Sequence, residues 1–171
     1  MIEKALKFAT QAHEGQLRKY TGEPYIVHPI AVSKIVEGVT DDEDMIVAAL
    51  LHDTVEDTDV TLEMVEENFG LRVATFVENL TDISTPDQGN RATRKQIDLD
   101  HTAKATPEAK TIKLADLIHN TGSITKYDKK FAAVYIKEKK ALLAVLSEGD
   151  KGLYKKALHL VNSYYREQNG S

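Results

Sequence analysis

Apolar residues recur every three to four positions through most of the chain, which is the spacing of one face of an α-helix. No stretch alternates apolar and polar residues convincingly, and no segment repeats. Besides the helices discussed below, amphipathic helices are expected over residues 2–13, 62–68, 73–80, 129–146 and 151–166. The pattern therefore predicts an all-α fold.

The most apolar of the expected helices lies at residues 40–51 and has hydrophobic side chains on nearly every side. Thr40 is a suitable N-cap, and Glu43 three positions later would complete a capping box. A helix without a polar face is expected to be buried. It leads into His52 and Asp53, and a buried carboxylate without a partner is costly, so a bound cation is one way to supply that partner.

Four ionisable residues fall within six positions at the end of this helix: His52, Asp53, Glu56 and Asp57. If the helix continues, the four-residue spacing places His52 with Glu56, and Asp53 with Asp57, on shared faces. A solvated helix end with incidental charges explains the same pattern, because paired charges are also common in structural networks. The rest of the chain has to decide between these interpretations.

Two other segments carry candidate metal ligands. His28 precedes Pro29, which suits the first position of a helix, so His28 is expected at or just before an N-cap. Pro107 begins another helix, expected over residues 107–120, in which Asp116 is flanked by apolar residues. Together with His52 and Asp53 these residues form a mixed nitrogen and oxygen set. Such a set suits Mn²⁺, Fe²⁺ or Zn²⁺, and the oxygen share and the lack of cysteine favour Mn²⁺.

Two basic segments stand out in a chain of net charge −5. The first is a loop rich in glycine and charge, and the second is a polar helix expected over residues 90–104. Their basic residues are Arg18 and Lys19 in the first, and Arg91, Arg94 and Lys95 in the second. A solvated turn and an exposed helix explain both segments. As phosphate-binding groups, arginine would offer a planar fork and lysine a point charge, and the second segment would form a lid over an anionic ligand.

The composition limits the classes of function. A chain of 171 residues can form one domain with a sizeable core, so a single domain over residues 1–171 is expected. The acidic net charge argues against nucleic-acid binding, and no apolar run or signal peptide indicates a membrane partner. The absence of cysteine fits a reducing compartment, so a cytoplasmic location is expected. The oligomeric state stays open.

Four segments, in this order along the chain, resemble the hydrolase domain of the RelA/SpoT alarmone enzymes, which are HD-domain metal-dependent phosphohydrolases. They are HEGQLRK (13–19), GEPYIVHP (22–29), AALLHDTVEDT (48–58) and IKLADLIHN (112–120). The resemblance covers about residues 1–124, and helices over about 128–167 are expected to pack against that part. Because no synthetase domain follows, the chain is similar to the stand-alone small alarmone hydrolases of the Mesh1 type. The resemblance implies an HD-domain helical bundle.

The resemblance also implies a reaction, which is hydrolysis of the 3′-pyrophosphate of (p)ppGpp to GDP or GTP and pyrophosphate, with Mn²⁺ or another divalent metal. The resemblance also assigns roles to the matching residues of this sequence. The metal ligands are His28, His52, Asp53 and Asp116, the acids beside the attacking water are Glu56 and Asp57, and the substrate-binding residues are Arg18, Lys19, Tyr25 and Asn120. Arg91, Arg94 and Lys95 are further substrate-binding candidates that the resemblance does not align.

Three alternatives remain. Leu117 departs from the family pattern, in which arginine or lysine is common, so the adenosine alarmones (p)ppApp are also credible substrates. A second alternative is an HD phosphohydrolase of another nucleotide, such as a dNTP or a 5′-monophosphate. The third is a non-catalytic alarmone-sensing module, which predicts a broken ligand set, whereas all four ligands and both acids are present here.

Overall fold

The computed structural model describes residues 1–169, and this part of the chain contains helices but no strand. An isolated antiparallel bridge joins Leu17 and Pro24. The helices are α1 (Ile2–Ala12), α2 (Val27–Glu37), α3 (Glu43–Leu51), α4 (Thr54–Asp57), α5 (Leu62–Phe69), α6 (Leu71–Leu80), the 3₁₀ turn η1 (Pro86–Gln88), α7 (Arg91–Ala103), α8 (Pro107–Tyr127), α9 (Lys129–Leu143) and α10 (Lys151–Asn169). The predicted all-α fold is confirmed. None of these helices is long and apolar enough to cross a lipid bilayer.

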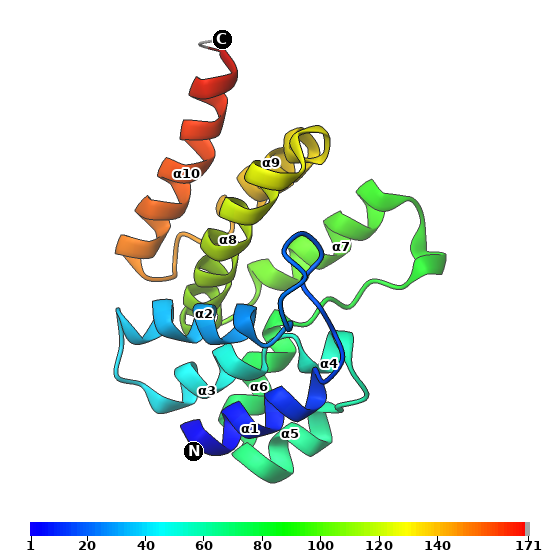
Figure 1. Cartoon of the computed structure of the whole chain (residues 1–171), viewed down its shortest axis with the longest axis vertical. Coiled ribbons are helices and arrows are strands. Elements are labelled where there is room, and N and C mark those ends of the chain that lie inside the picture. The colour runs from blue at the N-terminus through cyan, green and yellow to red at the C-terminus, as the bar shows by residue number, and fades with distance from the viewer. Residues whose placement is uncertain (170–171) are drawn as a thin grey trace.

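Helices α3 and α8 organise the arrangement. Figure 1 shows α1 to α6 gathered around α3 in the lower half of the view, while α8, α9 and α10 rise from that group. Helix α3 contacts α1, α2, α6 and α8, and α8 also contacts α9 and α10. Every residue of α3 from Met45 to Leu51 is buried, as its lack of a polar face predicted. The functional residues at the end of α3 are therefore anchored in the centre of the core.

The prediction of Thr40 as the N-cap of α3 was wrong by two residues. The N-cap is Asp42, whose Oδ1 accepts hydrogen bonds from the backbone N–H groups of Asp44 (3.1 Å) and Met45 (3.4 Å). The Thr40 hydroxyl instead accepts from the N–H of Asp42 at 3.1 Å. Both threonine and aspartate are good caps, so residue type alone does not choose between them.

The apolar helix ends before His52, as expected, and it does not continue through Asp57. Helix α3 ends at Leu51, and the short helix α4 begins at Thr54, whose hydroxyl donates to the Leu51 carbonyl at 2.7 Å. That bond satisfies one of the carbonyl groups left without a partner where a helix ends. His52 and Asp53 occupy the junction between the two helices, so their side chains are not held to the spacing of a single helix.

Two other boundaries differ from the predictions. His28 is the second residue of α2 and not its cap, because a tight turn before the helix, with the His28 N–H donating to the Tyr25 carbonyl at 3.0 Å, runs directly into it. Helix α8 continues to Tyr127, seven residues beyond its predicted end. The buried Thr121 donates its hydroxyl to the Leu117 carbonyl at 2.6 Å and so stays within the helix.

Candidate metal centre

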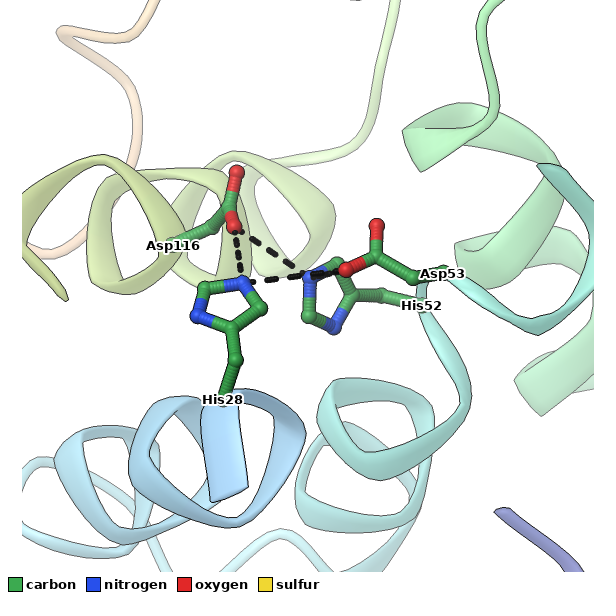
Figure 2. Close-up of side chains that lie close together, drawn as sticks. All are labelled: His28, His52, Asp53 and Asp116. Atoms are coloured by element: carbon green, nitrogen blue, oxygen red, sulfur yellow. Dashed lines mark hydrogen bonds and ion pairs between the residues drawn. The ribbon is translucent and has the colours of Figure 1, made fainter. Parts of the chain in front are cut away.

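Four side chains from three separate segments converge at one point (Figure 2). His28 comes from α2, His52 and Asp53 come from the junction of α3 and α4, and Asp116 comes from α8. One nitrogen of each histidine and one oxygen of each aspartate lie within 4.8 Å of one another. The Oδ1 atom of Asp116 is 2.8 Å from Nε2 of His28 and 3.3 Å from Nε2 of His52. The Oδ2 atom of Asp53 is 3.1 Å from the same His52 nitrogen.

The ring of His52 is oriented by the backbone of the preceding helix, α3. Its Nδ1 donates a hydrogen bond to the Ala49 carbonyl at 2.6 Å. A histidine that donates through one nitrogen offers the other as a ligand, and such a second hydrogen bond is the usual way in which proteins fix a metal-binding ring. The Nε2 atom of His52 therefore points into the cluster with its tautomer already set.

The ring of His28 is oriented by another histidine, His119 of α8. The two Nδ1 atoms lie 2.7 Å apart, and the rings are stacked with centroids 5.0 Å apart. Burial, the neighbouring His28 and the Arg18 guanidinium lower the pKa of His119 to about 4. A neutral His119 accepts a hydrogen bond from the Nδ1–H group of His28, which directs His28 Nε2 toward Asp116.

The electrostatics of the cluster favour a cation. Burial alone would lower the pKa of His52, but the carboxylates of Asp53 and Asp116 outweigh it and hold that pKa well above its usual value. Burial would raise the pKa of Asp53, but His52 outweighs it and brings that pKa to about 2. The acids thus retain a proton on a buried imidazole. A divalent metal would take the place of that proton, because a histidine ligand is neutral.

The donor set fits a divalent metal on its own chemistry. Two imidazole nitrogens and two carboxylate oxygens suit Mn²⁺, Fe²⁺ and Zn²⁺, and the chain holds no thiolate that would select a softer ion. Both rings have the supporting hydrogen bonds expected of metal ligands. The cluster is therefore a candidate site for one divalent metal ion.

Glu56 and Asp57 follow the cluster on helix α4. The Glu56 carboxylate accepts a hydrogen bond from the backbone N–H of Asp82 at 2.5 Å. Partial burial and the Asp82 carboxylate raise the pKa of Glu56 to about 7. Burial and the Asp53 carboxylate also raise the pKa of Asp57 above its ordinary value. Glu56 can therefore take up and release a proton near neutral pH, as a general base must.

Three of the predicted substrate-binding residues contact the cluster or one another. The Tyr25 hydroxyl donates to Asp53 Oδ2 at 2.6 Å. The Asn120 amide donates to Asp116 Oδ1 at 3.1 Å, and its oxygen accepts from Arg18 at 3.3 Å. Arg18, His119 and four other residues of α8, together with residues of the loop before α2, line a hollow of about 270 Å³.

Comparison with known proteins identifies the family. The HD domain family matches residues 5–148, which is most of the chain. The chain belongs to the HD-domain family. HD-domain hydrolases use divalent metals, in agreement with the cluster described above.

Relatives within the HD-domain family agree with the resemblance noted in the sequence. Human MESH1, a guanosine-3′,5′-bis(diphosphate) 3′-pyrophosphohydrolase, is 43% identical over 120 residues, covering 68% of this chain and 65% of the human protein. A probable GTP pyrophosphokinase of Mycobacterium leprae is 42% identical over 121 residues, covering 70% of this chain but only 15% of the bacterial protein. The chain thus spans less than two thirds of both of these relatives.

A solved structure matches nearly the whole of this chain. It is a metazoan ortholog of SpoT that hydrolyzes ppGpp and plays a role in starvation responses. The TM-score is 0.86 at 32% sequence identity, and the match covers 95% of this chain and 94% of the other. The predicted HD-domain helical bundle is therefore confirmed.

No contact joins the remaining predicted substrate-binding residues to the four residues of the metal cluster among the described residues. The Lys19 ammonium lies 5.4 Å from the Tyr20 ring. In helix α7, Arg91 forms an ion pair with Glu138 of α9 at 2.9 Å. The ammonium of Lys95, also in α7, lies 3.9 Å from the Glu138 carboxylate. The Nε atom of Arg94 is buried without a hydrogen-bond partner among the described residues. Their roles toward a ligand stay predictions.

Sequence reasoning missed two residues that lie beside the metal cluster. His119 was seen only as part of a family segment, although it follows Asp116 by three positions and so lies on the same face of α8. Lys113 precedes Asp116 by three positions, and its ammonium lies 3.3 Å from Asp116 Oδ2. The i, i+3 spacing was the available signal in both cases. The departure at Leu117 lies in the core, because that side chain is only 1% exposed.

Proposed function

We propose that this protein hydrolyses the 3′-pyrophosphate of (p)ppGpp, giving GDP or GTP and pyrophosphate. The observation that carries the proposal is the convergence of His28, His52, Asp53 and Asp116, with Glu56 one helical turn further along the chain. Human MESH1, which is named for this reaction, and the metazoan ortholog that hydrolyzes ppGpp support the choice of substrate. The substrate is thus a small nucleotide.

We further propose that the four clustered residues bind Mn²⁺. When bound, a divalent metal supplies Lewis acidity toward a phosphoryl oxygen and lowers the pKa of a water molecule. The residues around the cluster contribute by holding the ligands in place. Ala49 and His119 orient the two rings, and Tyr25 holds the Asp53 carboxylate.

Glu56 is proposed as the group that moves the proton. A water oxygen forms a bond to the phosphorus nearest the ribose while the bond from that phosphorus to the 3′-oxygen breaks. Glu56 accepts the proton of the attacking water and returns it to the leaving 3′-oxygen, a role that needs a pKa near the working pH. Asp57, whose pKa is also raised, is placed beside Glu56 as a second group that orients the water.

The nucleotide is proposed to lie along the face that carries Arg18, Tyr25 and Asn120. Arg18 and Asn120 are held together by their own hydrogen bond and present a guanidinium and an amide to the ribose and phosphates. The other basic residues proposed to attract the phosphates are Lys19, Arg91, Arg94 and Lys95. A cytoplasmic location, a single domain and the absence of nucleic-acid partners remain predictions from the sequence.

Product analysis tests the proposal. The purified protein is incubated with ppGpp and, separately, with ppApp, in the presence of Mn²⁺ or of a chelator. We expect release of pyrophosphate with GDP or ADP only when Mn²⁺ is present, and the two rates rank the guanosine and adenosine substrates. No turnover of either compound by Mn²⁺-loaded protein would contradict the alarmone assignment and favour another nucleotide.

A further inference from the structure

A second hollow, of about 410 Å³, lies between α7, α8 and α9. Through two of its lining residues it adjoins the metal cluster and Glu56. Lys113 contacts Asp116 directly, and the backbone of Asp82 donates to Glu56. A group that occupied this hollow would therefore lie beside the reacting centre, with one end next to the cluster. Its volume is within the range of small-ligand sites.

The hollow is lined by more positive than negative groups. Its lysines are Lys95, Lys113, Lys137 and Lys139, and its acids are Asp82, Asp98 and Glu138. Two of the acids already have partners. Asp98 accepts three hydrogen bonds from Ile83 and Ser84, and Glu138 pairs with Arg91 and Lys95. Two of the lysines have carboxylate partners as well, since Lys95 pairs with Glu138 and Lys113 with Asp116. Among residues 1–169 the ammonium groups without an ion pair are those of Lys137 and Lys139, and these two favour an anionic occupant.

Of the two lysines of this hollow without an ion pair among the described residues, Lys137 is exposed to solvent and Lys139 is half-buried. Among residues 1–169 its ammonium forms no ion pair, and it lies 4.9 Å from the centre of the Tyr135 ring. Burial and the neighbouring Lys113 lower the pKa of Lys139 to about 8. The Tyr135 hydroxyl is buried without a hydrogen-bond partner within the same part of the chain. A cation and an unused hydroxyl thus occur on successive turns of α9.

The order of the site residues along α8 shows where this hollow lies relative to the proposed nucleotide position. Lys113, Asp116 and Asn120 follow one another at spacings of three and four, so they lie along one face of the helix over about 10 Å. Asp116 Oδ2 faces Lys113, while Oδ1 accepts from Asn120. The lysine-lined hollow is therefore on the opposite side of the cluster from Asn120 and its partner Arg18.

We propose that Lys139 binds the distal phosphate of the substrate's 3′-pyrophosphoryl group, with that phosphate in the hollow between α7, α8 and α9. The inference rests on the proposed function, because it takes the nucleoside to lie on the Asn120 side. It makes Lys139 a residue that distinguishes a 3′-diphosphate from a 3′-monophosphate. Sequence reasoning gave Lys139 no role, since the helix that carries it was considered only for its apolar stripe and its packing.

The test is calorimetric binding of inorganic pyrophosphate, and separately of inorganic phosphate, to Mn²⁺-loaded protein at pH 7. Loss of one charge-assisted hydrogen bond corresponds to about a tenfold loss of affinity. We expect Lys139→Met to raise the Kd for pyrophosphate about tenfold, to change the Kd for phosphate less than about twofold, and to lower kcat/KM on ppGpp in parallel. Lys139→Arg keeps the charge and should bind pyrophosphate nearly as the wild type does.

Lys140→Met is a matched control. Lys140 is the next residue of α9, and its ammonium also lies over a tyrosine ring, 5.3 Å from the centre of Tyr165, but outside the hollow. It should bind pyrophosphate as the wild type does. If wild-type protein does not bind pyrophosphate, or if Lys139→Met binds it as tightly as Lys140→Met, the inference is wrong. Either result leaves turnover of ppGpp to be judged by product analysis, so the two proposals fail separately.

Discussion

At the scale of single residues, Glu56 combines a fixed position with a pKa suited to its proposed role. The N–H of Asp82 holds one carboxylate oxygen, and the group titrates near neutral pH because of partial burial and the Asp82 carboxylate. Asp53, three residues earlier, has a pKa of about 2 and so stays ionised throughout the working range. The two acids are thereby separated into one that exchanges protons and one that is a constant ligand.

Replacing Glu56 by glutamine should remove turnover without removing the metal. A general base contributes about 10² to 10⁴ in rate, so kcat on ppGpp is expected to fall by at least about a hundredfold. Bound Mn²⁺, measured by metal analysis after dialysis, should equal that of the wild type. Glu63→Gln, an exposed change on α5, is the control and should keep full activity. A Glu56→Gln rate within a few-fold of wild type would contradict the assignment.

The raised pKa of Glu56 also predicts a pH profile. A base acts only when deprotonated, so kcat/KM should be high above pH 7 and should fall as the pH drops through about 7. An ordinary glutamate would keep its activity down to about pH 4.3. The measurement is kcat/KM on ppGpp from pH 5 to pH 9 at saturating Mn²⁺. A kcat/KM that stays constant from pH 9 down to pH 5 would contradict a raised pKa of the catalytic base.

At the scale of elements, the start of α3 depends on Asp42. Its side chain caps two backbone N–H groups of the helix and also forms an ion pair with Arg72 at 2.7 Å. Loss of an N-cap costs about 1 kcal/mol, so Asp42→Ala should lower the melting temperature by roughly 2 to 4 °C. Asp41→Ala, at an exposed position with no capping role, should leave it unchanged. Equal melting temperatures of the two variants would contradict the role of Asp42.

Sequence patterns located the helices better than their ends. The buried α3 was predictable because apolar residues surround it, whereas its cap was not, since Thr40 and Asp42 are both acceptable. The break at His52 depends on a hydrogen bond from Thr54 to Leu51, which spacing does not reveal. A local pattern identifies the type of element, while its boundary depends on which of several competing hydrogen bonds forms.

The candidate site was predictable in part for the same reason. His28, His52, Asp53 and Asp116 were found through residue type and family resemblance, and the structure brings them within 4.8 Å. The pairing of His28 with His119 joins residues 91 positions apart, so no local spacing points to it.

At the scale of the whole molecule, the metal would join segments far apart in the sequence, because α2, the junction of α3 and α4, and α8 each supply ligands. A ligand that binds only the folded state at a hundred times its Kd stabilises it by about 2.7 kcal/mol. Mn²⁺ should therefore raise the melting temperature by roughly 5 to 10 °C, and a chelator should reverse the change. His52→Ala should abolish this increase, whereas His159→Ala, at an exposed position, should retain it. An undiminished increase in His52→Ala would place the metal elsewhere.

Helix α8 serves the core and the site at once, and this restricts how the protein can change. Leu114 and Leu117 of this helix are buried in the core, while Lys113, Asp116 and Asn120 face the site. One residue inserted between Lys113 and Asp116 would rotate everything beyond it by about 100°. Leu117 would leave the core at the same time as Asn120 left the site. Along α8, new ligand preferences can therefore arise by substitution but not by a change of length.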